Sequence, residues 1–261
     1  MSNKRHDRSC ETATHRLAAT APMRHNVRPG RLSTGITLPW RCGMALGIFA
    51  LGLAAVLFIP AGRLDWWGAW AYFGILAVGG AISTPILLRV NREMVAERFH
   101  LRRRSAQKAD VVIGSVMTAF WLLALVVAGL DQRWGWSPAM SSLLQCAGLV
   151  IGSVGYVFSM WAMTVNKFFA LLVRIQTERR HTVVASGPYG FVRHPGYAGG
   201  ILLFLSTPLI LGSWWAFLPM GLATCSLVMR TAVEDKSLQK GLDGYRNYTH
   251  KVPYRLLPFV W

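Results

Sequence analysis

The feature that most constrains this chain of 261 residues is the spacing of its apolar blocks. Six such blocks alternate with polar segments; they cover approximately residues 44–60, 67–88, 111–130, 140–164, 197–211 and 214–229. A helix of about 20 apolar residues crosses the hydrocarbon core of a bilayer, so the first four blocks are long enough to span it. Charged residues make up only 15% of the chain, below the roughly 25% of a typical soluble domain. The sequence therefore predicts an all-α integral membrane protein.

The last two apolar blocks are short and are separated by Gly212 and Ser213. A single helix over residues 197–229 would be about 50 Å long, whereas the hydrocarbon core is only about 30 Å thick. We therefore expect two helices that form a hairpin with its turn at these two residues. The result is a single membrane domain over residues 41–261 with five to six transmembrane helices.

Positive charge lies almost entirely on one side of the predicted membrane. Of the 28 Lys and Arg residues, only Arg63 and Arg133 lie in the loops on the other side. This positive-inside pattern predicts that both termini are cytoplasmic, and we expect a bacterial inner membrane as the location. The net charge of +17 is then explained without nucleic acid. Because no RNA-binding or DNA-reading motif is apparent, we expect no nucleic-acid partner.

The polar remainder of the chain limits other functions. Residues 1–40 are basic and aperiodic, so we expect a disordered arm, and residues 44–60 lack a signal-peptide cleavage site. The four cysteines are scattered, which predicts neither a disulfide scaffold nor a metal site. Residues 89–110 could form a basic helix on the lipid headgroups, although a simple topology signal is our favoured interpretation. Few ionisable residues lie in mid-span, which argues against a channel or a proton-coupled transporter.

The most unusual polar stretch is HTVVASGPYGFVRHPGYAGG, which runs from His181 to Gly200. Pro188 and Pro195 push the residue before each away from helical backbone angles. The free amides at the start of the following helix, near Tyr197, are a natural site for an anionic group. These residues could cradle a polar molecule with a flat ring, or they could anchor the helix end at the membrane interface. The residues alone favour neither interpretation.

A second polar cluster, RTAVEDKSL, follows the last apolar block directly. If the helix continues, Arg230 and Glu234 lie one turn apart on one face. They could hold a zwitterion or orient a carboxylate, but the cluster taken alone favours a surface ion pair worth less than about 1 kcal/mol. The predicted hairpin brings this cluster beside Tyr197. We therefore expect a cytoplasmic cofactor pocket formed by the loop of residues 165–196 and the C-terminal tail.

Together these stretches resemble the isoprenylcysteine carboxyl methyltransferase family. The resemblance rests on HTVVASGPYGFVRHPGYAG, RTAVEDKSL and the late YRNYTHKVP. It covers roughly residues 140–261, which would form the methyltransferase core. The first 130 residues resemble the family only as membrane helices.

The resemblance implies S-adenosylmethionine as methyl donor and methylation of a carboxylate on a lipid-like or prenylated substrate that enters from the bilayer. Arg230 and Glu234 would be the catalytic pair, with Arg230 facing the substrate carboxylate. The cofactor contacts carried over from the family are His181, Thr182, Val183, Val184, Tyr189, His194, Pro195, Gly196, Tyr197 and Glu234. Such a transfer needs mainly alignment. A carboxylate is already ionised at pH 7, so neither a general base nor a metal is required.

Two departures from the family pattern concern the edges of the cofactor site. The family's acidic pair is here Glu234-Asp235, whose second side chain is shorter. The family's glutamine upstream of the first histidine falls on Arg174, and Gln176 is two positions away.

Three other functions stay open from the sequence. A phospholipid N-methyltransferase has a similar R-H-P-x-Y signature, and its amine substrate would need a proton acceptor such as His194 or Glu234. An NADPH-dependent sterol-type reductase also resembles the C-terminal half, although no G-x-G-x-x-G fingerprint occurs. A membrane protein that keeps the fold without catalysis is the third.

Overall fold

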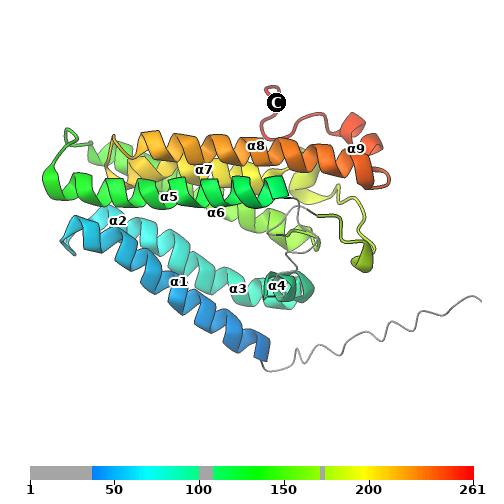
Figure 1. Cartoon of the computed structure of the whole chain (residues 1–261), viewed down its shortest axis with the longest axis horizontal. Coiled ribbons are helices and arrows are strands. Elements are labelled where there is room, and N and C mark those ends of the chain that lie inside the picture. Colours follow the sequence, from blue (N-terminus) through cyan, green and yellow to red (C-terminus); the bar gives the residue numbers. More distant parts are fainter. Residues whose placement is uncertain (1–36, 100–107, 171–173) are drawn as a thin grey trace, which may run out of the picture. The chain divides into compact units, whose positions relative to one another are not determined.

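The computed structural model describes residues 37–99, 108–170 and 174–261, and all regular elements in these ranges are helical (Figure 1). The predicted all-α class is therefore confirmed. The predicted arm of residues 1–40 lies outside the described residues except for its last four, which belong to the first helix. The elements are α1 (Thr37–Ala61), α2 (Trp67–Phe73), the π-helical turn η1 (Gly74–Val78), α3 (Gly79–Val90), α4 (Arg92–Phe99), α5 (Lys108–Trp134), α6 (Ser142–Val165), the 3-10 turns η3 (Thr177–Arg179) and η4 (Gly187–Gly190), α7 (Pro195–Leu211), α8 (Phe217–Gly241) and α9 (Tyr245–Lys251).

Four helical stretches are long and apolar enough to cross a membrane: Leu38–Ala61, Trp67–Val90, Ala109–Trp134 and Ser142–Val165. They coincide with the first four apolar blocks of the sequence. The second stretch is continuous through α2, η1 and α3. Helix α7 is apolar but has only 17 residues, and α8 continues past its apolar part to Gly241. The basic segment after α3 contains the short helix α4.

A row of glycines allows α7 to pack closely against α6. A Cβ atom added at Gly155 of α6 would lie 2.6 Å from the carbonyl oxygen of Gly199 on α7, and one at Gly152 would lie 2.6 Å from Oγ of Ser206. Small residues allow membrane helices to approach this closely. Ser159 Oγ also donates a hydrogen bond to the carbonyl of Gly196 at 2.9 Å. The first turn of α7 is thereby fixed against the end of α6.

The chain reverses between α7 and α8 at the position where the sequence predicts a break. Gly212 caps α7 with φ of +69°, a left-handed angle that strains any residue with a side chain. Helix α8 returns along α7 and also packs on α5 (Figure 1).

At this turn lies a buried acid, Asp131, with its hydroxyl partners. Its carboxylate accepts hydrogen bonds from the hydroxyls of Ser137 and Ser213, each at 2.5 Å, and from the Ser137 amide at 2.7 Å. We call these three residues the Asp131 cluster. It joins the loop after α5 to the loop between α7 and α8.

Candidate functional site

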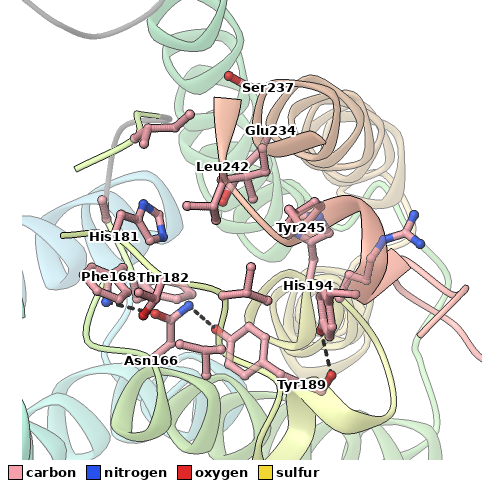
Figure 2. Close-up of a pocket in the computed structure, with 18 of the residues that line it drawn as sticks. Asn166, Phe168, His181, Thr182, Tyr189, His194, Glu234, Ser237, Leu242 and Tyr245 are labelled. Atoms are coloured by element: carbon pink, nitrogen blue, oxygen red, sulfur yellow. Dashed lines mark hydrogen bonds between the residues drawn. The ribbon is translucent and has the colours of Figure 1, made fainter. Parts of the chain in front are cut away.

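A pocket lies at the opposite end of α7 from the Asp131 cluster. It contains about 790 Å³ of empty space, including its open mouth. Three parts of the chain line it: the segment after α6, the segment that leads into α7, and the region of α8 and α9. In Figure 2, Phe168 and His181 lie on one side of this space and His194 and Tyr245 on the other.

The structure brings nine of the ten predicted cofactor residues to this pocket. They are His181, Thr182, Val183, Val184, Tyr189, His194, Gly196, Tyr197 and Glu234. The tenth, Pro195, is buried at the first position of α7, and within the described residues it is not part of the lining. Arg230 is not part of that lining either; it lies one turn before Glu234 on α8.

Glu234 projects from α8 toward the pocket, and its carboxylate is held by Tyr197. The hydroxyl of Tyr197 donates to Oε2 of Glu234 at 2.5 Å. The Tyr197 ring is stacked on the ring of His194, with centroids 5.8 Å apart and planes 7° apart. The guanidinium of Arg230 lies 5.7 Å from the centroid of the same ring. An ionised carboxylate only accepts hydrogen bonds, so Glu234 is suited to bind hydroxyl or ammonium groups of a ligand.

Arg230 is engaged by an acid that the sequence did not single out. Its Nε donates to Oδ1 of Asp110 at 2.8 Å, and its Nη2 donates to Oδ2 at 3.4 Å. Only 8% of Arg230 and 1% of Asp110 are exposed. Asp110 directly precedes the apolar block of residues 111–130, and nothing in the sequence shows that it would meet a residue 120 positions later.

The floor of the pocket is built around Tyr189. Asn166 Nδ2 donates to its hydroxyl at 3.1 Å, and the hydroxyl of Tyr248 donates to its backbone carbonyl at 2.6 Å. Burial raises the pKa of Tyr189 above its usual range; the hydrogen bond from Asn166 opposes this, and the nearby charge of Glu234 adds to it. Tyr189 therefore stays neutral at physiological pH.

An aromatic platform lies on the side of the pocket that faces His194 and Tyr245 (Figure 2). The rings of Phe168 and His181 lie 4.3 Å apart between centroids, with planes 31° apart. Lys167 Nζ lies 5.0 Å from the Phe168 centroid, and the guanidinium of Arg179 lies 5.6 Å from it. The buried amide of Gln176 donates to the backbone carbonyl of Phe168 at 2.7 Å. Such a platform is suited to stacking against a flat ring.

Directly behind the pocket, Asp235 is fully buried and is the centre of a hydrogen-bonded network. Its carboxylate accepts from Arg193 Nε at 2.9 Å, Arg255 Nε at 2.9 Å, Tyr245 Oη at 3.0 Å and Gln239 Nε2 at 2.7 Å, and His194 Nε2 lies 3.4 Å away. We call these six residues the Asp235 cluster.

The Asp235 cluster ties the R-H-P segment to the C-terminal tail. Burial alone would raise the pKa of Asp235, but hydrogen bonds from His194 and Arg255 and the charge of Arg193 outweigh it and hold the pKa below its usual range. The backbone amides of Arg193 and His194 donate to the carbonyls of Tyr254 and Arg255, each at 2.9 Å. The tail and the R-H-P segment therefore form one rigid wall of the pocket.

Several lining residues had not been predicted from the sequence. Tyr245 and Tyr248 belong to the quoted YRNYTHKVP motif, which was a usable signal for them. Asn166 and Phe168 follow α6 and carry no recognisable pattern. Of the two candidates for the family's glutamine position, Arg174 lines the pocket, and Gln176 supports Phe168 from behind.

Comparisons with known proteins found similar methyltransferases. A family model described as phospholipid methyltransferase matches residues 143–243. Protein-S-isoprenylcysteine O-methyltransferase of Schizosaccharomyces pombe is 23% identical over 204 residues, which cover 70% of this chain and 84% of that protein. A probable protein-S-isoprenylcysteine O-methyltransferase of Oryza sativa subsp. indica is 29% identical over 190 residues, which cover 67% of this chain and 92% of that protein.

Two further similarities are more limited. Delta(14)-sterol reductase TM7SF2 of Mus musculus is 33% identical over 93 residues, which cover 34% of this chain and 22% of that protein. The solved structure of a eukaryotic intramembrane Ras methyltransferase, isoprenylcysteine carboxyl methyltransferase, has a TM-score of 0.48 and 19% identity, and the match covers 86% of this chain and 85% of that one.

The two methyltransferase relatives match over most of their length, whereas the reductase matches over less than a quarter of its own. The matched family model, residues 143–243, covers all the lining residues of the pocket except Tyr245 and Tyr248. The chain is thus similar to protein-S-isoprenylcysteine O-methyltransferases over most of their length and, over residues 143–243, to the phospholipid methyltransferase family model.

Proposed function

We propose that this chain is a membrane methyltransferase that uses S-adenosylmethionine to methylate a carboxylate on a lipid-like or prenylated acceptor. The observation that carries the proposal is the convergence of nine motif residues, from two separate sequence stretches, on one pocket that the carboxylate of Glu234 borders. The names of the isoprenylcysteine O-methyltransferase relatives support the acceptor class.

The residues of the pocket fit this cofactor. Glu234 can accept hydrogen bonds from ribose hydroxyls or an amino group, and the Phe168–His181 platform offers a flat surface to a purine ring. When bound, S-adenosylmethionine supplies a methyl group activated by its sulfonium. The buried aromatic side chains would keep water from that methyl group, and Arg230 would orient the acceptor's carboxylate. The acceptor is already ionised at pH 7, so the site needs no general base.

The proposed arrangement in the membrane has six spans. Helices α7 and α8 would be the fifth and sixth and would form a hairpin, with both termini and the pocket at the cytoplasmic face of a bacterial inner membrane. The one-sided distribution of Lys and Arg supports this orientation. The acceptor's lipid chain would then reach the site from the bilayer, and the cofactor would reach it from the cytoplasm.

A phospholipid N-methyltransferase is the second candidate, because the matching family model carries that description. Transfer to an amine needs a group that takes a proton. His194 contacts Asp235 and Glu234 accepts from Tyr197, so both potential bases already serve other roles. Arg230 beside the pocket favours an anionic acceptor.

Isothermal titration calorimetry of the detergent-purified protein tests the cofactor. We expect S-adenosylhomocysteine to bind and NADPH not to bind. Binding of NADPH alone would overturn the methyltransferase proposal, and binding of neither would favour a membrane protein that keeps the fold without catalysis. A methyl-transfer assay with farnesylated N-acetylcysteine and with phosphatidylethanolamine then separates the two acceptor classes.

A further inference from the structure

Asp110 is a buried acid at the start of α5 that neither lines the pocket nor is expected to touch the acceptor. It is 1% exposed, and its carboxylate accepts both the Nε and the Nη2 bonds of Arg230, at 2.8 and 3.4 Å. A guanidinium donates in a planar fork, so two such bonds fix the orientation of the whole group. Asp110 therefore determines where Arg230 points.

The need for such a residue follows from the spacing on α8. Arg230 and Glu234 are one turn apart, and opposite charges at this spacing attract each other. In the structure the Nε–Nη2 edge of Arg230 faces Asp110, while Glu234 accepts from Tyr197. The arginine and the glutamate are thus drawn to different partners on α5 and α7.

We propose that Asp110 is a positioning residue that holds Arg230 in place for the acceptor's carboxylate and keeps it from turning toward Glu234. Glu234 is then left to Tyr197 and the cofactor. The inference rests on the proposed function, because it assigns Arg230 to the acceptor and Glu234 to the cofactor. Asp110 acts through Arg230 and touches neither ligand itself.

The test is Asp110→Asn, which keeps the shape of the side chain and removes its charge. We expect the KM for farnesylated N-acetylcysteine to rise about tenfold, because the charge-assisted bonds that orient Arg230 are weakened. The change in kcat should be smaller, below about threefold, since the aligned complex still forms at saturation. The dissociation constant for S-adenosylhomocysteine, measured by calorimetry, should rise by about threefold as Arg230 competes for Glu234. An unchanged KM would overturn the proposal.

Two comparisons separate positioning from general stability. Asp131→Asn removes an equally buried acid from the other end of α5 and should leave the KM unchanged; an equal rise in KM would overturn the proposal. In an Arg230→Ala background, Asp110→Asn should change the KM by less than about twofold, since the residue through which it acts is gone. A full additive effect there would also overturn it.

If Asp110→Asn does not fold, Asp110→Glu provides a second test of the positioning role. It preserves the charge but displaces it by one methylene, so the KM should rise by about threefold with an unchanged unfolding temperature. A wild-type KM would count against positioning. If the wild-type protein itself does not bind S-adenosylhomocysteine, the proposed function fails before any variant is compared. If the wild type binds and methylates while the Asp110 variants match it, only the positioning role fails.

Discussion

Glu234 and Asp235 are adjacent on α8, but their carboxylates face two different regions of the molecule. Glu234 is half-buried, accepts one hydrogen bond from Tyr197, and borders the empty space of the pocket. Asp235 is fully buried and accepts from two arginines, a tyrosine and a glutamine. Successive helical residues do not share a face, so one turn of helix contributes to both regions.

The difference between the two carboxylates shows how a buried acid can be assigned a role. A carboxylate whose oxygens are surrounded by protein donors stabilises the fold, because each partner would otherwise be left buried without a bond. A carboxylate that borders a cavity can still accept hydrogen bonds from a ligand. His194 joins the two regions, since its ring stacks on Tyr197 and its Nε2 lies 3.4 Å from Asp235.

The largest expected effect follows from removing the more buried acid. In Asp235→Ala the guanidinium of Arg193, 6% exposed, loses its counter-charge, which we expect to cost about 3–5 kcal/mol. Thermal unfolding of the purified protein should show a midpoint lower by several degrees. Lys236→Ala, at the next and exposed position of α8, is the matched control and should unfold like the wild type. An unchanged midpoint in Asp235→Ala would contradict the structural role of the Asp235 cluster.

The sequence predicted the pocket around Glu234 far better than it predicted the Asp235 cluster. Glu234 and the motif residues around it were assigned from their pattern, and their place at one pocket was expected from the reversal of the chain at Gly212. Asp235 was noted only as a shorter form of a family acid. Its role depends on a contact with Arg255 in the tail. Hydrophobic periodicity and motif spacing do not predict contacts between a helix and an irregular segment, so this role could not be inferred.

Asp110 illustrates the same limit at longer range. The apolar blocks predicted α5 and α8 correctly as helices, because hydrophobic length is a local property of the sequence. Which faces of two helices meet depends on packing in three dimensions. The ion pair of Asp110 with Arg230 therefore could not be inferred from the sequence, although each residue borders an apolar block.

The second prediction concerns ligand binding rather than stability. Glu234→Ala should weaken binding of S-adenosylhomocysteine by tenfold or more, about 1.4 kcal/mol, because the pocket loses its carboxylate acceptor. The unfolding midpoint of the unliganded protein should change much less than in Asp235→Ala, since water in the pocket can replace the partner of Tyr197. Calorimetry and thermal unfolding on the same preparation measure both quantities. Wild-type affinity in folded Glu234→Ala would remove Glu234 from the cofactor site.

The smallest expected effect is a pH dependence of the free energy of unfolding, caused by protonation of Asp235. Its pKa is held below the usual range in the folded protein, whereas an unfolded aspartate titrates near about 3.9. The unfolded state therefore binds more protons between these two values, so the stability contributed by Asp235 is complete above about pH 5 and is lost progressively as the pH falls below about 4. Burial, together with the charge of Asp235, raises the pKa of Tyr245, which stays neutral over this pH range.

Unfolding midpoints measured from pH 8 to pH 3 test this. The difference between the wild type and Asp235→Asn should be constant from pH 8 to pH 5 and should narrow below about pH 4, because only the wild type has this carboxylate to protonate. Glu234→Gln should leave the narrowing in place, since it does not alter the Asp235 cluster. A difference that stays constant down to pH 3 would mean that Asp235 does not supply the acid-sensitive part of the stability, and that a neutral acceptor holds Arg193 and Arg255 equally well.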